Sequence, residues 1–293
     1  MFWIKLKDIK SANPYNAGIL SPLQFAASFP YYLTLWGHRI HPHTFFETLS
    51  YVVAICLYLW LRRRLGDVIA APIRWTVVAA AVAGAALGAK ILYWLEDPSA
   101  TLSHMQDIGY LMGGKTIVGA LIFGVIAVEW MKRYIGLDQS TGDLYAIPLA
   151  VGIAIGRVGC FLTGLSDDTY GIATALPWGI DFGDGARRHP TQLYEIVFLL
   201  AMVPVLLLVL RSSHPTAGIG KDFAPSFRSG DVFKFFMVAY LSFRLLCDFI
   251  KPYPRVFLGL GTIQWACVLG LLYYSGDIGR WFRLMSRKTQ GAN

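Results

Sequence analysis

Long apolar segments alternate with short polar ones along most of this chain. Seven of the apolar segments approach the ~20 residues that cross the hydrocarbon core of a bilayer as a helix. Several end at basic residues, such as Arg62–Arg64 after the first segment. The pattern predicts an all-α, polytopic membrane protein with about seven transmembrane helices. Their expected ranges are 43–61, 74–94, 115–131, 145–163, 191–210, 232–250 and 259–275.

The first 42 residues follow a different pattern. They are amphipathic, and Pro14, Pro22 and Pro30 interrupt the apolar run that precedes the first predicted helix. A helix broken in this way is more suited to the membrane interface than to crossing the bilayer. We therefore expect an interfacial segment at 1–42, one membrane domain at 43–278 with an outer polar loop at 164–190, and a basic cytoplasmic tail at 279–293.

The composition agrees with a membrane protein. Hydrophobic residues make up 55% of the chain and charged residues only 15%, against about 25% charged residues in a soluble domain. The net charge of +8 is more typical of basic cytoplasmic loops than of nucleic-acid binding. The four cysteines lie in apolar segments without metal-ligand spacing. From the charge and the cysteines together, we expect no metal, cofactor or nucleic-acid partner. They are Cys56, Cys160, Cys247 and Cys267.

The distribution of basic residues predicts the orientation. With the N-terminus outside, the loops expected inside are rich in lysine and arginine, whereas the outer loops carry mainly acids. An odd number of spans then leaves the basic C-terminal tail inside. Lys5, Lys7 and Lys10 are exceptions near the N-terminus. The residues expected inside are Arg62–Arg64, Arg74, Lys132, Arg133, Arg211, Lys221, Arg228, Lys234, Arg280, Arg283, Arg287 and Lys288.

Ionisable residues within the predicted helices converge on one side. Such residues are costly in a membrane and usually face the bundle interior or a water-filled cavity. In the N-out, C-in topology they fall in the outer half of the membrane, next to the loop with Asp167, Asp168 and His189. The sequence therefore predicts one polar pocket near the outer interface. The converging residues are His43, Glu47, Lys115, Arg157, Glu195, Arg244, Asp248 and Lys251.

Arginine is the main basic residue of this predicted pocket. Tyr240, Arg244 and Asp248 form an i, i+4, i+8 stripe on the sixth helix. An intrahelical ion pair between Arg244 and Asp248 accounts for part of this pattern. Arg157 and Lys115 add more positive charge than such a pair needs. A phosphate head group is the anion expected at this depth, and arginine binds phosphate through two parallel hydrogen bonds.

Two histidines are candidate bases, each with an alternative role. His43 and Glu47 share a helical face at the start of the first helix, although His43 can also be a histidine at head-group level. His189 precedes Pro190 and can be a loop cap.

Four motifs together resemble the prolipoprotein diacylglyceryl transferase family. They are the Gly-Arg-Val-Gly-Cys-Phe-Leu-Thr-Gly run at 156–164 with Tyr170-Gly171, the Arg-His-Pro-Thr-Gln-Leu-Tyr-Glu run at 188–195, the spaced set Tyr240, Arg244, Asp248 and Lys251, and Gln264. Their order and the helix count match as well. The resemblance covers roughly residues 110–275.

The resemblance implies an activity and a location. Members of that family transfer the diacylglyceryl group of phosphatidylglycerol to a cysteine thiol in a lipoprotein signal sequence and release glycerol phosphate. They work at the outer side of the bacterial inner membrane. The expected partners are therefore phosphatidylglycerol, a lipoprotein precursor and membrane lipids.

The resemblance also implies roles for individual residues. Arg157 and Arg244 correspond to phosphate-binding arginines, Tyr240 to a pocket hydroxyl near the reacting centre, and Gly171 to a residue that shapes the outer loop. We expect the other pocket and motif positions to bind substrate. These are Lys115, Gln192, Tyr194, Glu195, Asp248, Lys251 and Gln264.

The chain departs from the family at its usual base. Val118 stands where the family has a histidine, Cys160 and Thr163 stand where it has asparagines, and Asp167-Asp168 replaces a glutamate. The acceptor thiol must still lose its proton to attack the glyceryl carbon. We therefore hypothesise that His43, oriented by Glu47, is the base, with His189 as the rival candidate.

Three functions fit the sequence. The first is the transferase. The second is a non-catalytic or altered-acceptor paralogue that binds anionic phospholipid or a lipoprotein precursor. The third is a transporter or flippase for an anionic substrate, which usually shows an internal repeat and broken midplane helices. The chain shows no repeat, and its polar residues gather near one face, which argues against a transporter.

Overall fold

The computed structural model describes residues 29–66, 69–213 and 227–290. Most of the predicted interfacial segment 1–42, together with Lys221, lies outside the described residues. The described part of that segment contains a hairpin of β1 (Leu33–Leu35) and β2 (His38–Ile40). The Tyr31 amide donates a hydrogen bond of 2.8 Å to the carbonyl of Leu162, which ties the start of the hairpin to the end of a central helix.

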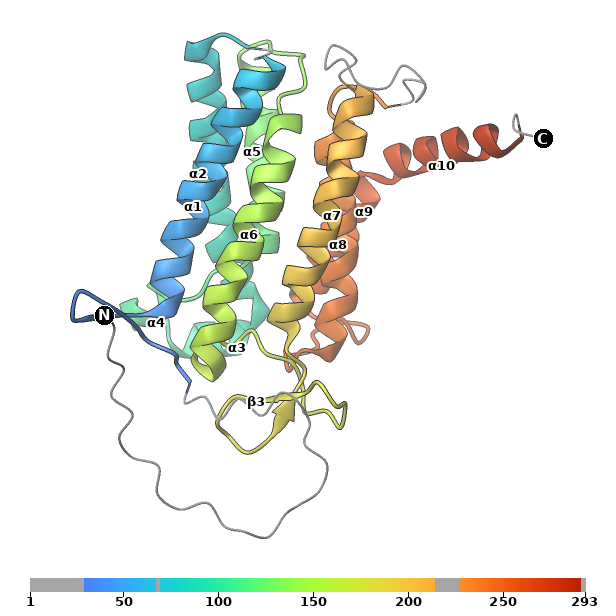
Figure 1. Cartoon of the computed structure of the whole chain (residues 1–293). Helices are drawn as coiled ribbons and strands as arrows, with labels where there is room; N and C mark the ends of the chain where they lie inside the picture. Colours follow the sequence, from blue (N-terminus) through green and yellow to red (C-terminus); the bar gives the residue numbers. More distant parts are fainter. Residues whose placement is uncertain (1–28, 67–68, 214–226, 291–293) are drawn as a thin grey trace, which may run out of the picture.

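The rest of the described chain is a helical bundle, and each of the seven predicted segments falls on a helix (Figure 1). Two small β-hairpins are additions to the predicted all-α fold. The bundle helices are α1 (Pro42–Leu65), α2 (Ala71–Glu96), α5 (Ile117–Tyr134), α6 (Asp143–Thr163), α7 (Thr191–Ser213), α8 (Asp231–Cys247) and α9 (Thr262–Tyr273).

Helix α6 is the centre of the bundle, because it packs against α1, α7 and α8. Its inward face combines small residues with a buried arginine, Arg157. Its first acid, Asp143, also orders the start of α8: one carboxylate oxygen accepts the Gly230 amide at 2.6 Å and the other accepts the Phe233 amide at 3.2 Å. Helix α8 therefore starts at a position fixed by α6.

Helices α2 and α5 form a second closely packed pair. Gly84 and Gly88 lie four positions apart on α2, and small residues at such spacing let two helix backbones approach closely. A Cβ atom built on Gly88 would lie 2.2 Å from the Phe123 Cβ and 2.4 Å from the Gly119 carbonyl oxygen. The two backbones meet at a distance that only glycine permits.

We expect Gly88→Ala to lower the free energy of unfolding by about 1–3 kcal/mol, because the added methyl group forces the two backbones apart. Gly279→Ala is the matched control, since a Cβ there meets nothing within 4 Å and alanine is the better helix former. Thermal unfolding in detergent measures both. Equal midpoints for the two variants would contradict the close contact.

Four helices of the described chain are long and apolar enough to cross a membrane: α1, α2, α6 with its extension to Asp167, and α7. Helix α5 is 18 residues long and carries three charged residues near its end, α8 is 17 residues long, and α9 is 12. Length and composition therefore support a multi-pass helical membrane protein.

The C-terminal region differs from the prediction. The seventh segment was expected to run to 275 and a tail to follow from 279, but α9 ends at Tyr273 and a new helix, α10 (Ser275–Gln290), projects away from the bundle (Figure 1). Arg280 of α10 pairs with Asp231 of α8, and Lys234 of α8 pairs with Asp277 of α10 at 2.9 Å. These two pairs tie the base of α10 to α8.

The connections at one end of the bundle carry short elements. They are α3 (Pro98–Ser103) and α4 (Ile108–Met112) between α2 and α5, the 3-10 turn η1 (Gly164–Asp167) after α6, the hairpin of β3 (Ile180–Asp181) and β4 (Arg187–Arg188), and the turn η3 (Asp248–Ile250) after α8. The predicted polar loop 164–190 is thus a structured segment that covers this end.

Candidate active site

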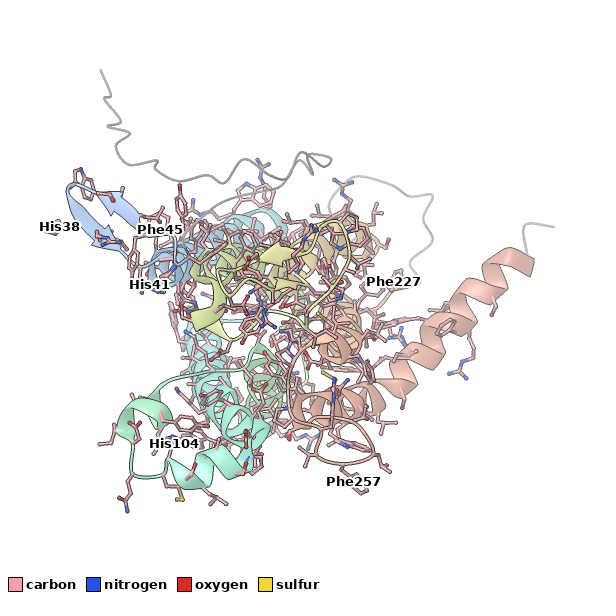
Figure 2. All side chains as sticks on the ribbon, turned by 90° about the horizontal axis from the view of Figure 1, so that it is seen from below. His38, His41, Phe45, His104, Phe227 and Phe257 are labelled. Atoms are coloured by element: carbon pink, nitrogen blue, oxygen red, sulfur yellow. The ribbon has the colours of Figure 1, made fainter. Side chains whose placement is uncertain are left out.

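The predicted pocket residues gather at this end of the bundle. Helices α1 and α7 begin here and α6 and α8 end here (Figure 1). His43, Arg157, Glu195 and Arg244 belong to these ends of the four helices. Figure 2 looks onto this end, with His38 of the hairpin and His104 of the α3–α4 connection at its periphery. The structure therefore brings together residues that are far apart in the sequence.

A buried ion-pair network joins three helices. The Arg157 Nε of α6 lies 2.8 Å from Glu195 Oε2 of α7, and Arg244 of α8 lies 3.5 Å from the same oxygen. Arg244 also pairs with Asp248 at 2.9 Å. The Tyr240 hydroxyl donates a 2.6 Å hydrogen bond to Glu195 Oε1. All five side chains are at most 5% exposed, so Glu195 is the common partner of both arginines.

The network brings three cations close together. Three cations are buried, since Lys251 is 3% exposed and joins the two arginines, against the two buried acids Glu195 and Asp248. Burial, followed by the charges of Arg244 and Arg157, lowers the pKa of Lys251 to about 8. A further acid, Glu96, is half-buried beside Asp248. The Asp167 carboxylate, whose side chain is 7% exposed, adds a third acid near Arg157, so cations and acids at this end are closely balanced.

Several polar atoms of the network have no hydrogen-bond partner among the described residues. They include the Arg244 Nε, one oxygen of the Asp248 carboxylate and both polar atoms of the Gln192 side chain, which is 1% exposed. Buried polar atoms are normally paired, and those that are not often face a ligand or water. Unpaired donors beside three clustered cations are suited to binding an anion.

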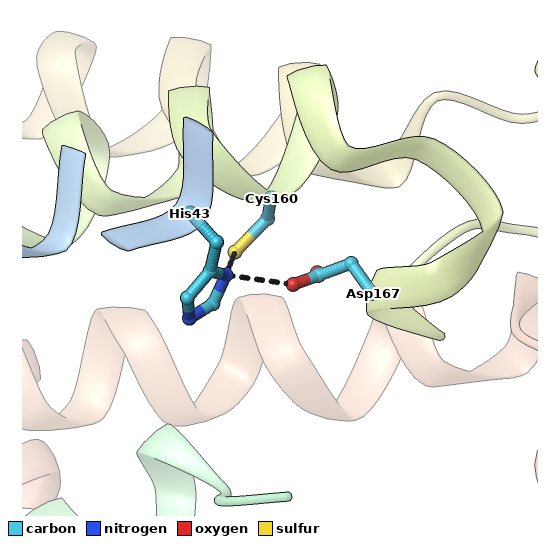
Figure 3. A group of neighbouring side chains, drawn as sticks. All are labelled: His43, Cys160 and Asp167. Carbon is cyan, nitrogen blue, oxygen red and sulfur yellow. Dashed lines mark hydrogen bonds and ion pairs between the residues drawn. The ribbon is translucent and has the colours of Figure 1, made fainter. Parts of the chain in front are cut away.

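A second polar group, made of His43, Cys160 and Asp167 (Figure 3), contacts Arg157 through Cys160. His43 Nδ1 is 2.9 Å from Asp167 Oδ1 and 3.9 Å from Cys160 Sγ. Cys160 lies 3.8 Å from an Arg157 guanidinium nitrogen. On the other side of the ring, His43 Nε2 is 3.5 Å from Glu47 Oε2. His43 is about one-third exposed, so this group is reachable from outside the bundle.

The predicted pocket cation Lys115 has a different partner. Its exposed ammonium group pairs with Glu47 rather than with the buried network. The Tyr51 hydroxyl donates a 2.9 Å hydrogen bond to the same carboxylate. Lys115 and Tyr51 therefore hold Glu47 in place against His43.

The rival histidine, His189, lies in the covering loop. Its Nδ1 is 3.1 Å from the Tyr194 hydroxyl, which accepts a 2.8 Å hydrogen bond from Trp178 Nε1. Gly171 is pressed against this point: a Cβ there would lie 2.5 Å from the His189 Cβ and 2.9 Å from the Ile250 carbonyl oxygen. The bonds described for His189 and Tyr194 thus order the loop over the site.

Gln264 makes structural hydrogen bonds. Its amide oxygen accepts from the Gly261 amide at 3.0 Å and from Arg255 at 2.5 Å, and its amide nitrogen donates to the Leu245 carbonyl at 3.1 Å. These bonds tie the start of α9 to α8. Its expected part in substrate binding stays a prediction.

The meeting of His43, Cys160 and Asp167 is the feature that sequence reasoning missed. The sequence places Cys160 in an apolar segment without metal-ligand spacing and Asp167 in the polar loop. One signal was present, because Cys160 follows Arg157 by three positions and shares its helical face. Arg255 donates hydrogen bonds to Gln264 and to the Asp248 carbonyl. This residue was also missed, because no motif or helical spacing in the sequence points to it.

Comparison with known proteins gives one family. The family model described as prolipoprotein diacylglyceryl transferase matches residues 30–278. The matched region contains every residue of the buried network and of the His43 group. It is most of the chain.

Individual relatives carry one name, phosphatidylglycerol–prolipoprotein diacylglyceryl transferase. The protein of Bordetella parapertussis is 36% identical over 187 residues, which is 61% of this chain and 64% of that relative. The protein of Paracidovorax citrulli is 28% identical over 84% of each chain. That of Methylocella silvestris is 27% identical over 89% of this chain and 82% of its own length.

The first of these alignments spans just under two-thirds of its relative's length, whereas the family model spans the chain from the hairpin to the start of α10. The four motifs, the buried arginine network and the match to the family model all indicate the same family. This chain belongs to the prolipoprotein diacylglyceryl transferase family.

Proposed function

We propose that this protein transfers the diacylglyceryl group of phosphatidylglycerol to the cysteine thiol of a lipoprotein precursor and releases glycerol phosphate. The observation that carries the proposal is the buried network of Arg157, Glu195 and Arg244. It places clustered cations and unpaired donors together at one end of a membrane-type bundle. Relatives over most of the chain are named for this reaction.

In this proposal the network binds the lipid phosphate. A phosphodiester carries one negative charge, and Arg157, Arg244 and Lys251 are the buried cations close enough together to bind it. As the bond between the glyceryl carbon and the phosphate oxygen breaks, negative charge grows on the leaving glycerol phosphate. Donors fixed in a water-poor site stabilise that developing charge strongly. Glu195 and Tyr240 hold the two arginines in position for this task.

The thiol must become a thiolate before it attacks the glyceryl carbon. We assign its activation to the group of His43, Cys160 and Asp167, which lies directly beside Arg157. Val118, at the position of the family's histidine, is 1% exposed and packs in the apolar core. Activation therefore falls to other side chains at the same end.

We also propose seven membrane crossings with the N-terminus outside, so that the site faces the outer side of a bacterial inner membrane. The support is the separation of charge between the two ends of the bundle. Arg62–Arg64, Lys132, Arg133 and Arg211 lie in the last turns of α1, α5 and α7, at the end opposite the site, as the positive-inside rule requires for a cytoplasmic face.

A turnover assay tests the proposal. Purified protein is mixed with phosphatidylglycerol vesicles and a peptide that carries a lipoprotein signal cysteine, and glycerol phosphate is measured. We expect release with this peptide and none with its Cys→Ser analogue. The loss of the family histidine favours one alternative, a paralogue that binds lipid without turnover. Lipid binding without any release would establish that alternative.

We expect His43→Ala to reduce the transfer rate by roughly 100-fold or more, the size of a lost proton-transfer or activating group. His189→Ala is the comparison, because its bonds to Tyr194 order the covering loop, and we expect a smaller loss. The rate of glycerol phosphate release measures both variants. Full activity in His43→Ala would refute the role of this group.

Binding of the lipid should depend on pH through Lys251. Its lowered pKa of about 8 means that the ammonium charge is present below this pH and is lost above it. We expect the KM for phosphatidylglycerol to rise as the pH increases through about 8. Lys251→Arg, whose guanidinium stays charged, should remove this rise. A KM that rises equally in both proteins would contradict the assignment.

A further inference from the structure

Three electron-pair donors converge beside Arg157 (Figure 3): His43 Nδ1, Cys160 Sγ and Asp167 Oδ1. The two measured separations from His43 Nδ1 are 2.9 and 3.9 Å, and all three atoms lie within 4.8 Å of one another. A Zn²⁺ ion held tetrahedrally at its usual bond lengths separates such atoms by about 3.3–3.6 Å. Side-chain rotations that move these donor atoms by about one ångström would bring them to the separations of a zinc site.

The geometry fits a shared cation better than a nucleophilic triad. In such a triad the acid and the nucleophile contact opposite nitrogens of the histidine. Here Asp167 and Cys160 both face Nδ1. A histidine nitrogen carries at most one proton, so Nδ1 cannot donate a hydrogen bond to Asp167 and accept a proton from Cys160 at the same time. Cys160 is also unsuited to carry the lipid itself, because a diacylglyceryl thioether on Cys160 would be a stable end product.

The surrounding contacts have the arrangement that metal ligands need. A metal-bound histidine normally directs its other ring nitrogen to a carboxylate, and His43 Nε2 faces Glu47 at 3.5 Å. The Thr169 hydroxyl donates a 2.6 Å hydrogen bond to Asp167 Oδ2, which leaves Oδ1 directed at His43. Thr169 thus holds the Asp167 carboxylate in position, as Lys115 and Tyr51 hold that of Glu47.

The backbone brings the ligands together at a glycine. A Cβ on Gly159 would lie 2.9 Å from the Phe46 Cβ and 3.2 Å from the His43 Cα. Its absence lets the first turn of α1 approach the last turn of α6, where Cys160 lies. The turn η1 then returns Asp167 to the same point.

We propose that His43, Cys160 and Asp167 bind one Zn²⁺ ion, and that its open fourth position takes the acceptor thiol; the second half of this inference rests on the proposed function. A mixed set of one nitrogen, one sulfur and one oxygen ligand suits zinc, and three protein ligands with an open position are typical of reactive zinc sites. In this assignment His43 is a ligand rather than the base.

The reaction then balances without a histidine base. The acceptor thiol loses its proton on binding, because a metal-coordinated thiol is deprotonated. Its sulfur forms a bond to the glyceryl carbon while the bond from that carbon to the phosphate oxygen breaks. The glycerol phosphate leaves with the electron pair, and the released proton passes to water or to the phosphate. The thioether product carries no charge, binds zinc weakly and dissociates.

The charges around the site support this step. Zinc with the Cys160 thiolate and the Asp167 carboxylate is neutral, and a bound acceptor thiolate adds one negative charge. The Arg157 guanidinium, 3.8 Å from Cys160 Sγ, offsets that charge. Arg157 thus connects the metal group with the phosphate network, which places nucleophile and leaving group next to each other.

Metal content and cobalt spectra test the site without any activity measurement. We expect about one zinc per purified chain, and a thiolate-to-cobalt charge-transfer band after exchange with Co²⁺. Cys160→Ser should lose the band and, like Asp167→Asn, should lose the zinc. Cys56→Ser is the matched control, because Cys56 is an exposed cysteine of the same helix as His43. Glu47→Gln should weaken zinc binding roughly 10- to 100-fold.

The acceptor's role is read from the same spectrum. A signal peptide with its cysteine should shift the cobalt bands, and its Cys→Ser analogue should not. No band in the wild type, or an equal band in Cys160→Ser, would overturn the metal site, and a band that the peptide leaves unchanged would overturn the thiol assignment. Transfer by metal-free protein would refute this inference alone, whereas a peptide-responsive spectrum without product would refute the proposed function alone.

Discussion

Replacement of Arg157 by lysine is expected to reduce diacylglyceryl transfer by roughly 100- to 1,000-fold, the loss seen when one charge-stabilising donor is removed from an active site. Arginine can pair with Glu195 through Nε and still present its remaining nitrogens to a phosphate and to Cys160. Lysine offers one ammonium group, which cannot meet both demands. The initial rate of glycerol phosphate release measures the effect.

Arg187→Lys provides the matched control. Arg187 lies in the covering loop, where it bonds the carbonyl oxygens of Gly179 and Pro177, and the same substitution there should leave the rate within a few-fold of wild type. Arg157→Lys with control-like activity would show that the buried guanidinium does not act on the lipid phosphate.

Replacement of Glu195 by alanine is expected to lower the free energy of unfolding by about 3–5 kcal/mol. Glu195 is 1% exposed and is the shared partner of Arg157 and Arg244. Its loss leaves buried positive charge without compensation, which costs more than the pair itself contributes. The Tyr240 hydroxyl would lose its acceptor as well. Thermal or denaturant unfolding in detergent measures the change.

Asp184→Ala tests whether burial is the cause. Asp184 also pairs with an arginine, Arg188, but both side chains are partly exposed in the covering loop. Exposed pairs contribute about 0–1 kcal/mol, so this variant should unfold close to wild type. Equal destabilisation of the two variants would contradict the buried network as the main support of this end.

Much of the site was predictable because membrane topology limits where polar residues can lie. Arg157, Glu195, Arg244 and Asp248 stood out as charges in apolar segments, and counting helix directions placed them at one end. The Arg244–Asp248 pair at helical spacing is present as expected. These inferences needed only the cost of charge in a membrane and the direction of each helix.

Other features depend on contacts that the sequence does not encode locally. His43 and Cys160 are 117 positions apart, and they meet because Gly159 allows α1 to approach α6. Lys115 was expected among the phosphate-binding cations, yet it pairs with Glu47 because the loop before α5 passes beside the start of α1. The hydrophobic periodicity of a sequence describes one helix at a time, so it cannot predict contacts between side chains of different helices.

The same limit applies to the helix ends. The break between α9 and α10 falls at Tyr274, within an apolar run that reads as one segment. The base of α10 is held to α8 by the pairs Arg280–Asp231 and Lys234–Asp277. Asp231 lies on a different helix, so the turn could not be located from the run itself.

The most direct test of the central claim is the intact mass of the signal peptide after incubation with the purified protein and phosphatidylglycerol of defined acyl chains. We predict a new species heavier by one diacylglyceryl group, with the added mass on the cysteine, and its loss in Arg157→Lys. An unmodified peptide, under conditions in which a family member with the usual histidine modifies it fully, would contradict the transferase assignment.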